Sequence, residues 1–299
     1  MLILYPAEPF AGRVIDAVYG PEQTEAERHG FQTALLDFEA LLEGDTRRAL
    51  RFLPLEPGPL LYRGWMLRAE SYARLHAALL ERGWTPLHSP EDYRNLHHLP
   101  PQFAHLEAFS PRTVWIAGET PAEVDREELR AALATFGAGP LIVKDYVKSR
   151  KHEWDSACFI ADAADVAGAM QIIETFLSRQ GEALQGGVVL RAFETFTPLA
   201  RHQQSGMPLT LEYRAFVLDG QMLILSEYWE QVANAVPPPL DWIESIAAGL
   251  MGRFLTLDVA QRLDGVWRVV EIGDAQVAGL PEQLPVAAFY QALSAQLGG

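Results

Sequence analysis

Residues 254–272 decide the fold, and they read FLTLDVAQRLDGVWRVVEI. Apolar and polar residues alternate on both sides of Asp264-Gly265, and Asp-Gly between alternating segments is a strong signal for a β-hairpin. A two-residue turn places Asp258 directly opposite Glu271. Opposed Cβ atoms lie about 4.5–5.5 Å apart, and like charges there destabilise a sheet. The pattern therefore predicts two carboxylates that project together from one face, with apolar residues on the other face.

A divalent cation between the two carboxylates would remove their repulsion. Mg²⁺ binds one or two protein carboxylates together with phosphate oxygens and water, and Asp274 is a candidate third ligand. Without the ion, Asn or Gln at Asp258 or Glu271 is expected to leave the fold intact or to stabilise it by about 0.2–1 kcal/mol. An exposed acidic sheet face in an acidic protein, or a slip of register, is the alternative. A glycosidase-type acid pair is disfavoured, because no sugar-stacking platform lies nearby in the sequence.

A second hairpin is predicted around Asp219-Gly220, between strands at 211–218 and 221–228. The same turn geometry places Glu212 opposite Glu227, with Arg214 between them on the same face. A guanidinium held by two acids can be purely structural. Its planar fork also suits a transferring phosphoryl group or a substrate carboxylate.

The chain contains 24 lysines and arginines, but only three of them are lysines. Lys144, Lys148 and Lys151 all fall within residues 143–152, at the end of an apolar strand and in the polar loop after it. Lysine carries a compact ammonium on a flexible stem, which suits contact with phosphate. A solvated surface loop is the competing interpretation.

The composition limits the class of protein. A formal net charge of −15 disfavours a duplex-binding protein, although one basic patch can still bind a nucleotide. The single cysteine, Cys158, excludes an internal disulfide and a multi-cysteine metal site. We find neither a signal peptide nor an apolar run long enough to cross a membrane, and we expect a cytoplasmic protein.

The order of predicted elements indicates an α/β fold that becomes α+β in its C-terminal part. Residues 1–112 are expected to form an α/β lobe, in which 35–42 read as a helix and 86–111 as a linker with ordinary loop histidines. Residues 113–193 are expected to form a small α+β unit, whose first helix starts at the capping box of Thr120 to Glu123. The rest of the chain, 194–299, holds the two hairpins.

Taken together, these parts resemble the ATP-grasp superfamily over about residues 112–283. The segments that carry the resemblance are PLIVK (140–144), VVLRAFE (188–194), EYRAFV (212–217), and Asp258 with Glu271 on paired strands. The resemblance implies an N-terminal pre-ATP-grasp domain (1–112) and an ATP-grasp domain (113–299). The latter divides into a lid-like part (113–193) and a metal-binding part (194–299).

The resemblance also implies roles for individual residues. Lys144 and Lys148 would contact the phosphates of ATP, with Lys151 a weaker candidate, and Arg214 would stabilise the transferring phosphoryl group. The metal ligands for Mg²⁺ would be Asp258, Glu271 and Asp274. Backbone at Arg191, Ala192 and Phe193 would hold adenine, with Glu194 near the adenine or ribose. The chain departs from the superfamily where the phosphate loop lacks glycine and where Gly273 replaces a usual asparagine.

The implied activity is that of an ATP-dependent, ADP-forming carboxylate–amine ligase acting through an acylphosphate. A small molecule, amino acid or peptide is the expected substrate, and Arg63 is a candidate for holding its carboxylate or else a structural ion-pair residue. Two alternatives stay open. One is an ATP-grasp module that binds nucleotide without chemistry. The other is a nucleotidyltransferase that adenylates Lys144, which is disfavoured because Lys144-Asp145-Tyr146-Val147 lacks the x-Asp-Gly that follows such a lysine.

Overall fold

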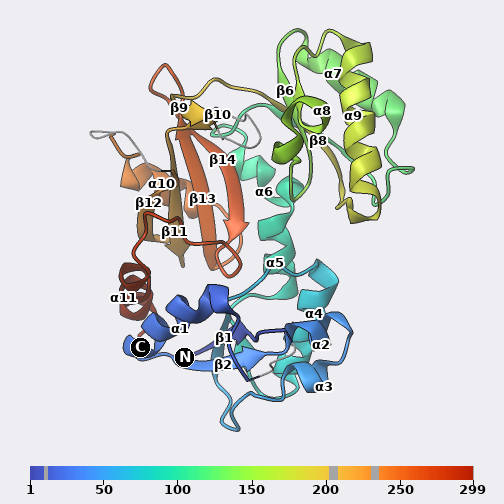
Figure 1. The fold of residues 1–299 in the computed structure, drawn as a ribbon. Coiled ribbons are helices and arrows are strands. Elements are labelled where there is room, and N and C mark those ends of the chain that lie inside the picture. Colours follow the sequence, from blue (N-terminus) through green and yellow to red (C-terminus); the bar gives the residue numbers. More distant parts are fainter. Residues whose placement is uncertain (10–12, 202–207, 230–235, 299) are drawn as a thin grey trace.

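The computed structural model describes all residues except 10–12, 202–207, 230–235 and 299. Figure 1 shows a blue N-terminal lobe, a green and yellow α+β lobe, and an orange sheet beside both. This confirms the predicted fold class, α/β with α+β architecture in the C-terminal part.

The N-terminal lobe is built on a parallel sheet with the strand order β2-β1-β3-β4. All five residues of β1 are buried, as expected for a central parallel strand covered by helices. The strands are β1 (Leu2–Pro6), β2 (Gln32–Leu36), β3 (Pro59–Tyr62) and β4 (Thr85–Pro86). The helices are the 3₁₀ turn η1 (Ala17–Tyr19), α1 (Gly20–Arg28), α2 (Phe38–Leu42), α3 (Thr46–Ala49), α4 (Ala69–Leu80), α5 (Pro90–His97) and α6 (Leu99–Leu106).

Two expectations for this lobe are wrong. Residues 35–42 do not form one helix, because Asp37 caps α2 by accepting from the Ala40 amide and strand β2 ends just before it. The presumed linker 86–111 contains α5 and α6. Ser89 and Asp92 form a capping box at the start of α5, a signal that is present in the sequence.

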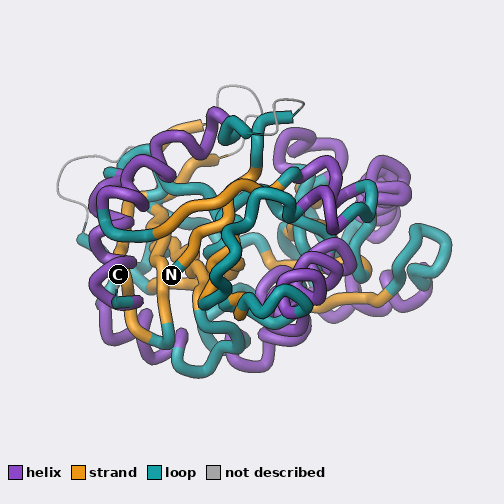
Figure 2. The backbone as a smooth tube through the Cα atoms, turned by 90° about the horizontal axis from the view of Figure 1, so that it is seen from below, coloured by secondary structure: helices purple, strands orange, loops and turns teal. Residues whose placement is uncertain are grey.

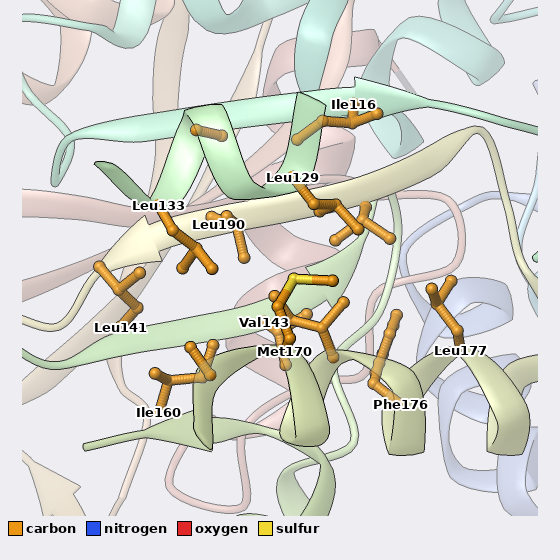
Figure 3. Close-up of a cluster of buried hydrophobic side chains, with 14 of the residues drawn as sticks. Ile116, Leu129, Leu133, Leu141, Val143, Ile160, Met170, Phe176, Leu177 and Leu190 are labelled. Carbon is orange, nitrogen blue, oxygen red and sulfur yellow. The ribbon is translucent and has the colours of Figure 1, made fainter. Parts of the chain in front are cut away.

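The second lobe, which we call the lid, is an antiparallel sheet with the order β5-β8-β6-β7. Its strands are β5 (Thr113–Ala117), β6 (Leu141–Asp145), β7 (Phe159–Ile160) and β8 (Gly187–Ala192), and its helices are α7 (Arg126–Phe136), η2 (Lys151–Glu153), α8 (Trp154–Ala157), α9 (Val166–Gln180) and η3 (Gly181–Ala183). Figure 3 shows its core, in which Leu129 and Leu133 of α7 and Met170 and Phe176 of α9 pack over Val143 and Leu190. All buried residues of this core lie between positions 116 and 190.

The first lid helix begins later than predicted. Asp125 is the N-cap of α7 and accepts from the amides of Glu127 and Glu128. The presumed capping box at Thr120 to Glu123 is a turn instead, in which the Glu123 carboxylate accepts from the Glu119 amide.

The large sheet is antiparallel, with the order β12-β11-β13-β14. Its strands are β11 (Glu212–Leu218), β12 (Gln221–Glu227), β13 (Phe254–Gln261) and β14 (Trp267–Asp274), beside a short pair, β9 (Pro198–Arg201) and β10 (Pro208–Thr210). Helix α10 (Leu240–Ala247) covers one face through Ile243 and Ile246. Helix α11 (Val286–Leu297) packs on the opposite face at one end, where Phe289 meets Phe216.

Helix α11 also joins the N-terminal lobe. The Tyr290 hydroxyl hydrogen-bonds to the Tyr5 hydroxyl at 2.7 Å and to the Glu22 carboxylate at 2.7 Å. As a result the two ends of the chain lie side by side, which both views show (Figures 1 and 2).

Candidate active site

The opposed pair of Asp258 and Glu271 is confirmed by the register of β13 and β14. The path to this register differs from the prediction. The Arg262 amide donates to the Val266 carbonyl, so three residues form the hairpin loop instead of two. A β-bulge at Val270 then shifts the register back by one residue. The bulge therefore restores the pairing that the two-residue turn predicted.

Arg214 on β11 lies directly opposite Asp258 on β13. Its Nε and Nη2 donate to the two carboxylate oxygens of Asp258 at 2.8 and 2.7 Å, and its Nη1 donates to the Gly279 carbonyl at 2.9 Å. The side chains are only 13% and 4% exposed. Burial alone would lower the pKa of Arg214, but Asp258 outweighs it and the pKa is raised. The pair is thus a buried, fork-shaped ion pair.

Glu271 is the open member of the acid pair, with 43% of its side chain exposed. Its Oε1 lies 4.0 Å from the Lys144 ammonium at the end of lid strand β6. Burial alone would raise the pKa of Glu271, but Lys144 and Lys151 outweigh it and the pKa lies below its usual value. Burial lowers the pKa of Lys144. The predicted phosphate lysine and metal carboxylate, 127 positions apart in sequence, are therefore neighbours.

Arg191 ties the lid to the bulge. Its Nη1 donates to the Val270 carbonyl at 2.5 Å and its Nε donates to the Thr113 hydroxyl at 3.2 Å. The carbonyl left free of the β13–β14 ladder by the bulge thus anchors the lid beside Glu271.

The backbone amides predicted to hold adenine have partners inside the lid. The Ala192 amide donates to the Arg112 carbonyl and the Phe193 amide to the Pro140 carbonyl. The Phe193 ring lies edge-on to Phe159 at 5.2 Å and to Trp154 at 5.9 Å. At this position the lid offers an aromatic group rather than free amide donors.

Glu194 does not point toward a nucleotide position as predicted. Its carboxylate accepts from Arg268 at 3.1 and 3.2 Å and pairs with Arg262 at 3.5 Å. Both arginines belong to the β13–β14 hairpin, so Glu194 is a link between lid and large sheet. Such a contact depends on residues about 70 positions away, which no local pattern shows.

The loop after β6 is organised by a buried acid, Asp145. One carboxylate oxygen accepts from the amides of Val147 and Lys148, and the other accepts from the Gln180 side chain. The Lys148 side chain is exposed. Desolvation alone would lower the pKa of Lys151, but the carboxylates of Glu271, Glu212 and Asp258 raise it. Lys151, the weaker candidate in the sequence, is thus the loop lysine that responds to the acid pair.

Asp274 is not a third ligand, because it lies on the opposite face of β14 from Glu271. Three positions along a strand reverse the side-chain direction. Asp274 is 1% exposed, accepts from the Gln276 amide and side chain, and lies 3.1 Å from His88 Nδ1. His88 Nε2 in turn accepts from the Phe254 amide. The cluster joins the N-terminal lobe to the large sheet, so His88 is not an ordinary loop residue.

Gly273, on the same face as Glu271, lies opposite Thr256. A Cβ at position 273 would come within 2.9 Å of the Thr256 hydroxyl oxygen. A side chain there would require Thr256 to move, which gives a local reason for the glycine.

Arg63 is a structural residue and not a substrate residue. It is 1% exposed, forms a two-fold hydrogen-bonded pair with Glu22, and donates to the carbonyls of Ala275 and Ala278. Its fork is filled by the protein, as in the ion-pair alternative.

The predicted pairing of Glu212 with Glu227 is wrong. A bulge opposite the step from Phe216 to Val217 shifts β12 by one residue, so Glu227 pairs with Tyr213. Glu212 pairs with Ala260 of β13 instead. Burial and the neighbouring Asp258 raise the pKa of Glu212 to about 7. Glu212 therefore belongs to the acid group around Asp258, a role that the sequence pattern did not predict.

The donor set fits Mg²⁺ in a restricted sense. No group of three His, Cys, Asp or Glu side chains converges within the described residues. Two opposed carboxylates are present, and one of them is open to solvent. Mg²⁺ commonly takes one or two carboxylates and completes its shell with phosphate oxygens and water.

A lid sheet that carries a lysine toward carboxylates on a second antiparallel sheet defines an ATP-grasp protein. Residues 135–293 match the model of a family described as an ATP-grasp domain, the third family of its clade. The chain belongs to this family. A sequence search of curated proteins found no match.

Solved structures with the same fold cover nearly the whole chain. A RimK domain ATP-grasp protein from Sphaerobacter thermophilus is 17% identical, with a TM-score of 0.58 and 98% of each chain covered. D-alanine–D-alanine ligase from Bacillus anthracis, solved with ATP, is 13% identical with a TM-score of 0.56, covering 100% of this chain and 96% of that one. The ATP-grasp ligase PsnB, solved with Mg and ADP, is 16% identical with a TM-score of 0.55, covering 98% and 96%.

Within the described part of the chain, no helix is long and apolar enough to cross a membrane.

Proposed function

We propose that the chain is an ATP- and Mg²⁺-dependent carboxylate–amine ligase that forms an amide bond through an acylphosphate. The observation that carries the proposal is the run of alternating charges from Arg214 through Asp258 and Glu271 to Lys144. It spans both sheets and places cations on either side of an acid pair. Such an arrangement suits a phosphate chain and its metal.

The parts of the nucleotide would find different partners in this arrangement. Asp258 and Glu271 would hold Mg²⁺, which neutralises charge on the phosphates when bound. Lys144 and Lys151 would contact the phosphates, with Lys148 reaching in from the loop. The Phe193 group described above offers apolar aromatic surface for a purine ring.

The chemistry would proceed in two steps. A carboxylate oxygen of the substrate attacks the γ-phosphorus, the bond to the β-phosphate oxygen breaks, and ADP leaves. The amine nitrogen then attacks the acyl carbon, loses a proton, and displaces phosphate that retains one oxygen of the carboxylate. Three of the five N–H groups of Arg214 donate to described residues, and the other two can face the transferring phosphoryl group.

Transfer of ¹⁸O tests this route. With an amino-acid panel labelled in the carboxylate, we expect ADP and singly labelled inorganic phosphate in equal amounts, only when a suitable carboxylate is present. Release of pyrophosphate in place of ADP would instead support adenylation of Lys144. Labelled carboxylate with unlabelled phosphate would refute the acylphosphate.

A second candidate is a module that binds nucleotide without chemistry. It is favoured by the Arg214 side chain, whose fork is already paired with Asp258. Tight binding of MgATP together with no carboxylate-dependent ADP release across the panel would support it.

A further inference from the structure

The parallel sheet of the N-terminal lobe has a topological switch point between β1 and β3. The chain leaves β1 for β2 on one side and then crosses to β3 on the other side, giving the order β2-β1-β3-β4. In open parallel sheets, ligands bind outside the carboxyl ends of the strands at this point. The relevant segments are those that follow β1, around η1, and β3, at residues 63–68.

These two segments expose large apolar side chains close to one another. Val18 is 61% exposed, Trp65 41% and Met66 38%. The segments are held together, because the Trp65 indole N–H donates to Asp16 at 2.9 Å and its ring lies edge-on to Tyr19 at 5.2 Å. Large apolar side chains that gather on a fixed surface commonly mark a binding site.

The same surface is joined to Arg214 by residues 276–279. The Gly64 amide donates to the Gln276 carbonyl, and the Arg214 Nη1 donates to the Gly279 carbonyl. Three residue steps span roughly 10 Å at most. Arg68 also donates to the Glu182 carbonyl of the lid at 3.3 Å. The segment at 63–68 thus stands where the N-terminal lobe, the lid and the strand end after β14 meet.

We propose that Trp65, Met66 and Val18 bind an apolar side chain of the carboxylate substrate and so select substrates with bulky aliphatic or aromatic groups. This inference rests on the proposed ligase function. A substrate whose carboxylate lies near Arg214 can reach this surface with a side chain of ordinary length. Acidic side chains are disfavoured by Asp16 beside the indole and by the overall charge of −15.

The indole N–H signal of Trp65 in ¹H–¹⁵N spectra reports binding without turnover. The probes are L-leucine and L-phenylalanine, with glycine and L-aspartate as controls, in the presence of MgADP. The Trp65→Phe variant assigns the signal. Trp115, 36% exposed on the lid, supplies an internal control, assigned with Trp115→Phe. We expect saturable shifts of the Trp65 signal with leucine or phenylalanine only, and no shift of the Trp115 signal.

A kinetic arm measures ADP release with the same amino acids. Trp65→Ala is expected to raise KM for the apolar substrates about tenfold and to leave KM for glycine unchanged, because only the apolar side chain loses its contact. Met66→Ala serves as a second variant, and Leu55→Ala, at a 99% exposed position, as the matched control that changes nothing.

The outcomes separate this inference from the ligase proposal. ADP release without a Trp65 shift, or equal shifts with aspartate and leucine, would overturn the side-chain site and leave the ligase standing. A selective Trp65 shift without ADP release with any carboxylate would support the site and count against the ligase. Neither signal would overturn both.

Discussion

Asp258→Asn should destabilise the protein strongly even when no metal or nucleotide is present. The substitution leaves the Arg214 guanidinium, 13% exposed, without its charge partner. Removing one member of a buried ion pair costs about 3–5 kcal/mol. This exceeds the gain of about 0.2–1 kcal/mol expected from relief of repulsion with Glu271. The sequence-based expectation of a neutral or stabilising effect at position 258 is therefore reversed.

Urea unfolding at pH 7 with EDTA measures the effect, and the same sheet offers a matched control. Arg253 and Asp219 form an equally fork-shaped pair at 2.7 and 2.8 Å, but both side chains are about half exposed. Asp219→Asn should cost less than about 1 kcal/mol, since water replaces the lost partner.

Glu271→Gln provides the complementary case. Because Glu271 is 43% exposed and 4.0 Å from Lys144, its substitution should change stability by less than about 1 kcal/mol. Both Asp258→Asn and Glu271→Gln should abolish ADP formation. Equal costs for Asp258→Asn and Asp219→Asn would refute the reasoning, and so would full ADP formation by Glu271→Gln.

Three further predictions concern the nucleotide, the lysines and pH. Calorimetry should show ATP binding at least tenfold weaker with EDTA than with Mg²⁺, since opposed carboxylates repel phosphates; equal affinity would contradict the metal assignment. Lys144→Ala should raise the Kd of MgATP about tenfold or more, and Lys151→Ala less, because a strand end is the more rigid mount; small and equal changes would return both lysines to the solvated surface. The pKa of Glu153, lowered to about 2 by hydrogen bonds from Arg150 and Arg179, means that this group stabilises the fold above about pH 4.5 and loses its effect as pH falls toward 2. Carboxyl NMR titration checks the value, and an unshifted midpoint in the Arg150→Gln variant would contradict the cause.

Alternation and turn signals in the sequence predicted the two hairpins but not their bulges. At Asp258 and Glu271 the prediction succeeded because a longer loop and a bulge at Val270 offset each other. At Glu212 the bulge in β12 had no such counterpart, and the pairing failed by one residue. Bulges are set by tertiary contacts, here including the bond from Arg191 to the Val270 carbonyl, and no two-residue period contains them.

Other errors have different physical origins. Asp274 was misassigned although strand alternation places it on the face opposite Glu271, so this error was avoidable. The roles of Arg63 and Glu194 depend on Glu22, Arg262 and Arg268, whose proximity arises only from the packed lobes. The approach of Lys144 to Glu271 was expected from resemblance, and its residue-level geometry required the structure.

The position of α11 bears on the order in which the lobes complete themselves during synthesis. Every buried residue of the lid core has been made once residue 190 is added, so the lid can fold while the rest of the chain is still being translated. The core around Tyr5 and Phe31 needs Tyr290, which arrives about 100 residues later. At roughly 5–20 residues per second the first lobe waits 5 to 20 seconds or so for its last helix. The segment translated first is thus among the last to be buried, and a stalled ribosome would expose it to chaperones and proteases.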